Sequence, residues 1–131
     1  MVKQGLFIKD FVILSIMIKL ILRLEGAALF LTSLYFYYLF QGNWLIFVLL
    51  LFTPDISMLG YLKDKKLGAY IYNTVHNYLL GIAIILLGTV LKDNLIRSVG
   101  IILIAHIALD RFLGFGLKYI SGFKDTHLQK V

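Results

Sequence analysis

The sequence contains no cysteine, a single proline and only seven acidic residues among its 131 positions. Without cysteine the chain can form no disulfide, no thiolate metal site and no cysteine nucleophile. The lone proline, Pro54, is followed by Asp55 and lies just after the unbroken apolar run Trp44–Phe52. A carboxylate and a helix breaker are costly in such a stretch, so Asp55 is the first candidate functional residue.

The rest of the composition is strongly apolar. Hydrophobic residues make up 60% of the chain and the mean hydropathy is +0.89, which is not typical of a soluble domain. Several segments approach the roughly 20 apolar residues that cross a bilayer. The net charge of +6 does not indicate nucleic-acid binding, because the basic residues cluster at the ends of apolar runs. The sequence therefore predicts a single integral-membrane domain over residues 1–131.

We expect an all-α fold, because only helices satisfy their own backbone groups in lipid without closing a barrel. Residues 1–21 predict a basic amphipathic helix that lies on the membrane interface and is retained as part of the protein. An inserted extra span is the alternative for this segment. Residues 22–120 predict an antiparallel bundle of four transmembrane helices, at about 22–41, 44–62, 67–91 and 95–119. Residues 121–131 predict a polar tail.

The loops predict the orientation in the membrane. The positive-inside rule places the more basic side in the cytoplasm, and with it both termini and the second loop. The opposite side holds only Lys92 and Arg97. The basic side is defined by Arg23, Lys63, Lys65, Lys66, Lys118, Lys124 and Lys130, with Lys3 and Lys9 nearby.

Polar residues from several predicted spans reach a similar depth in the cytoplasmic leaflet. At 1.5 Å per residue, Asp55, His76 and Asp110 lie about 10–14 Å below the cytoplasmic edge, with His106 deeper and Glu25 shallower. His106 and Asp110 are four residues apart and share a helix face. Imidazole and carboxylate groups together suit a divalent metal such as zinc, iron or manganese. We predict that Asp55, His76, His106 and Asp110 are the metal ligands.

Further residues complete this hypothesis. Arg111 is a candidate to clamp an anionic substrate, and Glu25 is a candidate general base. Asn73 and Asn77 are candidates to orient a metal-bound histidine.

Each of these residues also has a structural interpretation. Asp55 can favour the start of a helix after Thr53 and Pro54, and His106 and Asp110 can form a hydrogen-bonded pair. Asp110 can neutralise its neighbour Arg111, and Glu25 can pair with a basic residue at the interface. These interpretations remain open on the residues alone.

Several motifs together resemble a family of small bacterial integral-membrane proteins known only as a domain of unknown function. The resemblance begins near Glu25 and includes the tail, so His127 is counted with Asn73 and Asn77 as a supporting residue. It implies a four-span protein of the bacterial cytoplasmic membrane and supplies no activity. The matching stretches are Leu24–Gly26, Pro54–Tyr61, Gly68–Tyr78, His106–Tyr119 and Thr126–Leu128.

A weaker similarity is to membrane-bound metal-dependent hydrolases, which also carry Pro-Asp in one helix and His and Asp in others. Here Asp55 is followed by Ile56 and Ser57 rather than by a second acidic residue and a histidine. The leading hypothesis is a metal-dependent membrane hydrolase that acts on an amphiphilic substrate from the cytoplasmic leaflet. The alternatives are a carrier or binding protein for a proton, ion or small ligand, and a structural subunit of a membrane assembly or homo-oligomer.

Overall fold

The computed structural model describes residues 2–131, with side chains from residue 4 onward. Every regular element in this part of the chain is a helix, and the only β-type pairing is an isolated bridge between Lys118 and Thr126. The prediction of an all-α fold is confirmed. The elements are α1 (Val2–Leu39), α2 (Trp44–Leu51), the 3₁₀ helix η1 (Thr53–Leu62), α3 (Lys65–Val75), α4 (Tyr78–Val90), α5 (Asn94–Leu113) and α6 (His127–Lys130).

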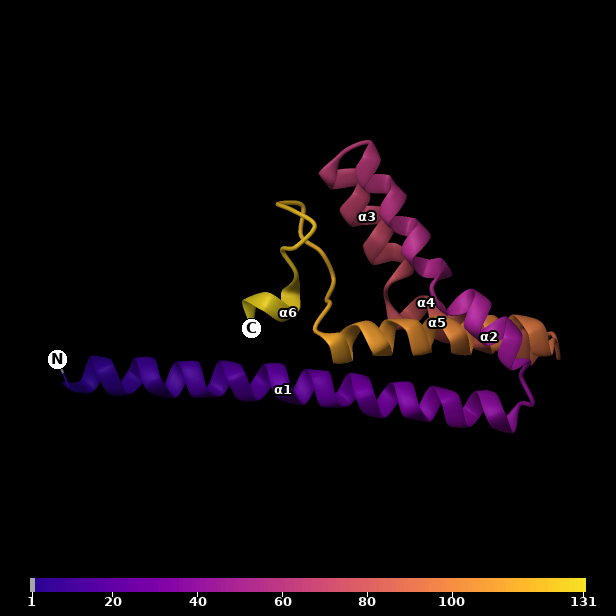
Figure 1. Cartoon of the computed structure of the whole chain (residues 1–131), viewed down its shortest axis with the longest axis horizontal. Helices are drawn as coiled ribbons and strands as arrows, with labels where there is room; N and C mark the ends of the chain where they lie inside the picture. Colours follow the sequence, from indigo (N-terminus) through magenta and orange to yellow (C-terminus); the bar gives the residue numbers. More distant parts are fainter. Residues whose placement is uncertain (1) are drawn as a thin grey trace.

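Helix α1 is continuous over 38 residues and runs along the whole molecule (Figure 1). The predicted interfacial helix and the predicted first span are thus two parts of one helix, since no proline interrupts this stretch. The helix ends at a tight turn in which Gln41 has a φ of 52°. Asn43 then caps α2 through its side-chain oxygen, which accepts from the backbone N–H groups of Leu45 and Ile46.

Two later predicted spans are broken. At Pro54 the α-helical geometry of α2 gives way to η1, because proline offers no N–H and its ring clashes with the preceding turn. Helices α3 and α4 are separated at His76 and Asn77 and are bent by 42°. Asn77 begins the second piece by accepting from the backbone N–H of Leu80. Both breaks fall beside predicted metal ligands.

Helix α5 forms the centre of the fold and carries many of the buried residues. Helices α1 and α4 pack on it but make almost no contact with each other. Glycines allow these close approaches. A Cβ on Gly26 would lie 2.7 Å from the backbone nitrogen of Phe112, and one on Gly88 would lie 2.5 Å from that of Arg97. Small residues play this role in many helix bundles.

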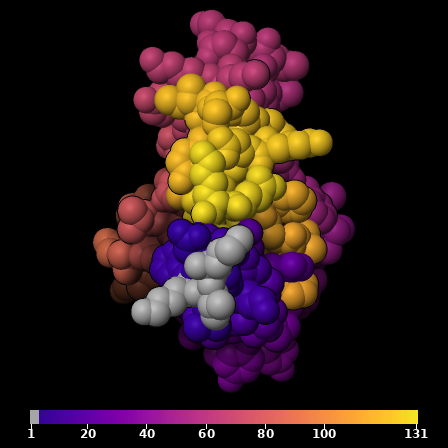
Figure 2. All heavy atoms as spheres, turned by 90° about the vertical axis from the view of Figure 1, so that its left-hand side faces the viewer, coloured from indigo at the N-terminus to yellow at the C-terminus, as the bar shows by residue number. Residues whose placement is uncertain are grey.

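The segment after α5 folds back over the bundle. Figure 2 shows it stacked between the start of α1 and the hairpin of η1 and α3. The side chain of Asn73 donates to the carbonyl of Lys118 at 2.8 Å and accepts from its N–H at 2.7 Å. His127 Nδ1 accepts from the backbone N–H of Leu117 at 2.8 Å. These contacts attach the tail to the helices.

Only part of the described chain is long and apolar enough to cross a bilayer. Trp44–Leu62 satisfies this condition, and α3 with α4 satisfies it if the bent pair is one span. Charged residues interrupt the other two predicted spans: Arg23 and Glu25 lie in α1, and Arg97, Asp110 and Arg111 lie in α5. The structure thus does not confirm four membrane-spanning helices, and that number stays a prediction.

The close contact of α4 with α5 yields a stability prediction. Gly88→Ala forces its new methyl group against the backbone of Arg97, and we expect the free energy of unfolding to fall by about 1–3 kcal/mol. The matched control is Gly5→Ala, which lies in α1 with no atom within 4 Å of the added Cβ. The control should be neutral or stabilising by up to about 1 kcal/mol. Equal thermal-unfolding midpoints for the two variants would contradict this packing.

The tail predicts a pH dependence. Burial lowers the pKa of His127 from 6.5, and the charge of Arg111 lowers it further. A histidine with a lowered folded-state pKa stabilises fully above its unfolded pKa and loses that contribution as the pH falls below it. His127→Ala should therefore cost about 1–2 kcal/mol at pH 7.5 and distinctly less at pH 5.5. Unfolding of wild type and variant at both pH values measures this difference, and a cost that is constant with pH would contradict it.

Candidate metal centre

Four predicted ligands meet where the two helix breaks face α5. Asp55 lies in the first turn of η1, directly after Pro54. His76 is the residue at which α3 ends. His106 and Asp110 lie one turn apart on α5. The breaks matter because each one places a polar side chain at a helix end, next to the unbroken helix that carries the other two ligands.

The ligand atoms of these four residues all lie within 4.8 Å of one another. The two imidazole Nε2 atoms are 3.0 Å apart. Asp55 Oδ1 lies 3.6 Å from Nε2 of His76 and 3.5 Å from Nε2 of His106. Asp110 Oδ2 lies 3.8 Å and 3.6 Å from the same two atoms. A tetrahedral site with bonds of about 2.0–2.1 Å has ligand atoms about 3.3–3.4 Å apart, close to these values.

Burial differs across the cluster. The side chains of His76 and His106 are 0% and 2% exposed, whereas that of Asp110 is 14% exposed and that of Asp55 is 37% exposed. The imidazoles therefore form the closed side of the centre and Asp55 the accessible side. Burial of polar atoms at this level is costly unless they are paired or bound to a cation.

The surroundings of His76 determine which of its nitrogens carries the proton. Its Nδ1 lies 3.1 Å from the carbonyl oxygen of Tyr72, which can only accept, so a neutral ring places its hydrogen on Nδ1. Nε2 of His76 then carries a free lone pair, which faces His106 and the two carboxylates. The hydroxyl of Ser57 lies 3.4 Å from the same Nδ1 and is not activated by it as a nucleophile, because that nitrogen already carries the hydrogen.

Tyr72 is a supporting residue that we did not single out from the sequence. Its ring stacks on the imidazole of His76 with centroids 3.7 Å apart, and its hydroxyl donates to Asp110 Oδ2 at 3.2 Å. One side chain thereby orients two of the four ligands. Its spacing of four residues before His76 on α3 is the signal that could have identified it.

Glu25 and Arg111 lie outside the four-residue cluster. Arg111 is buried and donates to two backbone carbonyls, those of Phe115 at 2.9 Å and His76 at 3.1 Å. Glu25 is exposed on α1 and lines a cavity of about 280 Å³ with Arg111, Tyr78 and His127, and none of the four ligands lines it. The catalytic roles of Glu25 and Arg111 stay predictions.

The other three predicted supporting residues bond to the backbone. Asn73 hydrogen-bonds to the backbone of Lys118, and Asn77 caps α4. His127 accepts a hydrogen bond from the backbone N–H of Leu117. Asn73 and Asn77 flank His76 in sequence and fix the helix break that presents it. Their contribution to the centre is thus to position the chain that carries a ligand.

An apolar cavity of about 390 Å³ is lined by chain neighbours of the ligands, although no ligand lines it. Two of its lining residues, Pro54 and Val75, directly precede the ligands Asp55 and His76 in the chain. Leu103, three residues before His106 on α5, also lines it. The other lining residues are Leu50, Thr53, Val99 and Ile102.

The fold and site define an all-α protein with a buried cluster of two histidines and two aspartates that could hold a metal. The family model of a domain of unknown function, DUF4260, matches residues 19–131, and the chain belongs to this family. The predicted membership of such a family is confirmed. No curated protein and no solved structure matches the chain.

The pairing of Asn73 with Lys118 yields a prediction for the scaffold around the centre. Asn73→Ala leaves a backbone N–H and a carbonyl without partners, so we expect a loss of about 2–4 kcal/mol in the free energy of unfolding. Thr74→Ala is the control, because the exposed Thr74 hydroxyl bonds only to the carbonyl of Tyr70 within α3. We expect a change within about 0.5 kcal/mol for the control. Equal effects in chemical denaturation would disprove the role of this pair.

Proposed function

We propose that Asp55, His76, His106 and Asp110 bind one divalent metal ion and that the protein is a metal-dependent hydrolase. The observation that carries the proposal is the concentration of lone pairs at the cluster. Each of the four ligand atoms can accept, and the histidine nitrogens lie 3.0–3.8 Å from one another and from the carboxylates. Such an arrangement is repulsive unless a proton or a cation lies between the groups.

The residues suit zinc, iron or manganese in both type and number. A metal there would supply a water ionised near neutral pH as the nucleophile for hydrolysis. Tyr72 would hold His76 and Asp110 in place for binding. Asp55 lies on the accessible side, where substrate and water would enter.

The proposed substrate is amphiphilic, with its apolar part in the 390 Å³ cavity that Pro54 and Val75 line. We also propose that the protein lies in the bacterial cytoplasmic membrane with four spans and both termini in the cytoplasm. Large apolar side chains are exposed along α1, α2 and α4, as expected of surfaces that face lipid. The excess of basic residues at one end of the predicted spans supports the orientation.

Metal analysis of the purified protein tests the proposal, because the chain contains three histidines and only two of them lie in the cluster. We expect about one equivalent of metal in wild type and in His127→Ala, and at least a tenfold loss of affinity in His76→Ala and His106→Ala. Substoichiometric metal that is indifferent to the two cluster substitutions would overturn the metal centre.

Hydrolysis requires a separate measurement. The protein stripped of metal and the reloaded protein should be compared on p-nitrophenyl esters of short and long acyl chains in micelles. We expect turnover only after reloading, and faster turnover of the long-chain esters. A loaded protein that cleaves neither chain length, and that also fails on a long-chain phosphodiester, would refute the hydrolase and leave the metal centre standing.

One observation favours a second function. The Nε2 atoms of His76 and His106 are at hydrogen-bond distance, 3.0 Å, and a metal-free pair could share a proton. The protein would then be a proton or ion carrier. Pyranine-loaded liposomes should in that case show proton flux that is lost in His76→Ala, in the presence of a chelator.

A further inference from the structure

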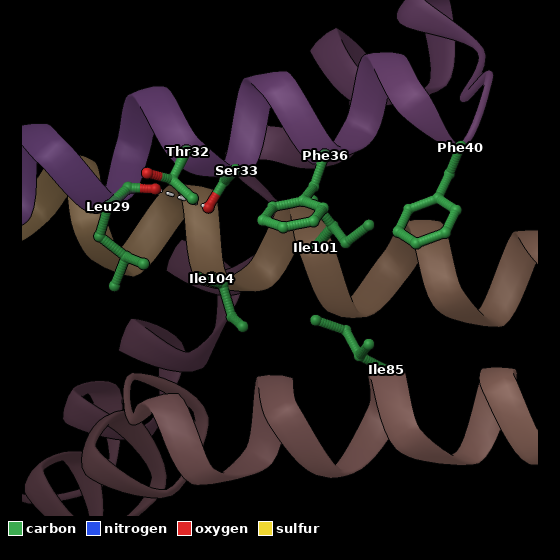
Figure 3. A pocket seen from close by; sticks show the side chains of 8 residues that line it. All are labelled: Leu29, Thr32, Ser33, Phe36, Phe40, Ile85, Ile101 and Ile104. Carbon is green, nitrogen blue, oxygen red and sulfur yellow. Dashed lines mark hydrogen bonds between the residues drawn. The ribbon is translucent and has the colours of Figure 1, made fainter.

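A long apolar groove lies between α1 and α4, on the side of α5 away from the metal ligands. Figure 3 shows Phe36 and Phe40 of α1 and Ile85 of α4 pointing into it, with Ile101 of α5 at its floor. Its volume is about 340 Å³. The groove exists because α1 and α4 pack on α5 without closing on each other.

The groove presents no free polar group. Its only two hydroxyls belong to Thr32 and Ser33, and each donates at 2.8 Å to a backbone carbonyl one turn earlier in α1. A polar ligand would therefore lose its hydrogen bonds to water without replacement. The groove suits a hydrocarbon chain.

The 280 Å³ cavity that Glu25 lines adjoins the groove on the side nearer the tail. Leu29 lines both spaces. On α4, Tyr78 of the second space lies seven residues before Ile85 of the first, and on α5, Arg111 lies seven residues after Ile104. Residues seven apart share a helix face, so the two spaces lie in line along the same three helices, one apolar and the other polar, and we refer to them together as the channel.

The polar end is rich in hydrogen-bond donors. His127 accepts from Leu117 through Nδ1, so its neutral ring carries the hydrogen on Nε2. Tyr78 contributes a hydroxyl, and Arg111 contributes a positive charge. The single carboxylate is that of Glu25, which forms no ion pair within the described residues. These groups complement a phosphate that is accompanied by an amine.

We propose that this channel binds one phospholipid with an amine-bearing head group, as in phosphatidylethanolamine. One acyl chain lies along α1 from Leu29 to Phe40, a length of about 16 Å at 1.5 Å per residue. The phosphate lies among Arg111, Tyr78 and His127, and the ammonium faces Glu25. The site is separate from the metal centre, since none of the four ligands lines either space, and it depends on the proposed function only for the membrane location.

Lipid binding to the delipidated protein in detergent tests this proposal by native mass spectrometry. The probes are phosphatidylethanolamine, phosphatidylglycerol with the same acyl chains, and inorganic phosphate. We expect retention of one phosphatidylethanolamine and weaker retention of phosphatidylglycerol. Glu25→Gln should reduce the preference for the amine by about two- to fivefold, the usual effect of an exposed ion pair.

Two neighbouring positions on α1 give a matched test of the channel itself. Thr32 is exposed and lines the groove, whereas Leu31 is 64% exposed and does not line it. Thr32→Trp should fill the groove and reduce phosphatidylethanolamine binding at least tenfold, and Leu31→Trp should leave it unchanged. Both positions are at the surface, so both variants should fold, and unfolding midpoints without lipid check this.

Several results would overturn the proposal. If wild type retained the two lipids equally, the amine would have no role in binding. If Thr32→Trp retained as much phosphatidylethanolamine as wild type, the channel would not be the binding site. Thermal stabilisation by inorganic phosphate to the same extent as by lipid would show an ion site only. All measurements are repeated with EDTA, and binding that persists there is independent of the metal centre.

Discussion

The close approach of two buried imidazoles to two carboxylates is the interaction on which the rest of the structure depends. Buried lone pairs of this kind are costly without a shared proton or cation, so the surrounding fold must hold them together. It does so with two helix breaks. Pro54 interrupts the segment that carries Asp55, and the end of α3 releases His76 toward α5. Straight helices at these positions would place neither residue at a helix end.

Side-chain hydrogen bonds to backbone groups stabilise the chain around the ligands. Arg111 holds the carbonyl of His76, and Asn73 holds the backbone of Lys118. Arg111 replaces the backbone partner that an uninterrupted helix would have provided for the carbonyl of His76, and Asn73 supplies partners to a residue that lies outside the helices. The tail is therefore part of the support of the centre, although none of its residues is a ligand in the cluster.

Helix α5 separates two chemically different regions. One of its faces carries His106 and Asp110 against the broken helices. Another carries Ile101, Ile104 and Arg111 against α1 and α4. The same central helix thus supports a cluster of metal-ligand type and the proposed lipid channel, and the glycines at its contacts with α1 and α4 keep both flanking helices close.

Parts of this arrangement were predictable from local chemistry. The spacing of His106 and Asp110 places them on one helix face, and Asp55 was conspicuous after the only proline. The break at His76 had a local signal as well, since Asn77 is a strong helix-capping residue, but the apolar run around it favoured one continuous span. The depth of each residue then indicated that Asp55, His76 and Asp110 share a level in the fold, with His106 one turn deeper.

Other features depend on contacts between residues distant in sequence. Only the folded chain brings the Arg111 guanidinium to the backbone carbonyls that accept from it. The same holds for the backbone of Lys118, which pairs with the side chain of Asn73. The same is true of Glu25, whose place on α1 relative to α5 depends on how Gly26 meets Ala108 and Phe112. The continuity of α1 was missed because its charged residues suggested a boundary, although nothing in its backbone requires one.

X-ray absorption spectroscopy of the metal-loaded protein shows directly whether His76 and His106 bind one metal ion. We expect a first shell of nitrogen and oxygen atoms at about 2.0–2.1 Å for zinc, with the multiple scattering of two imidazole rings. In His106→Ala the scattering of one ring should disappear. A first shell without imidazole, or identical spectra for wild type and variant, would refute a metal centre formed by His76 and His106.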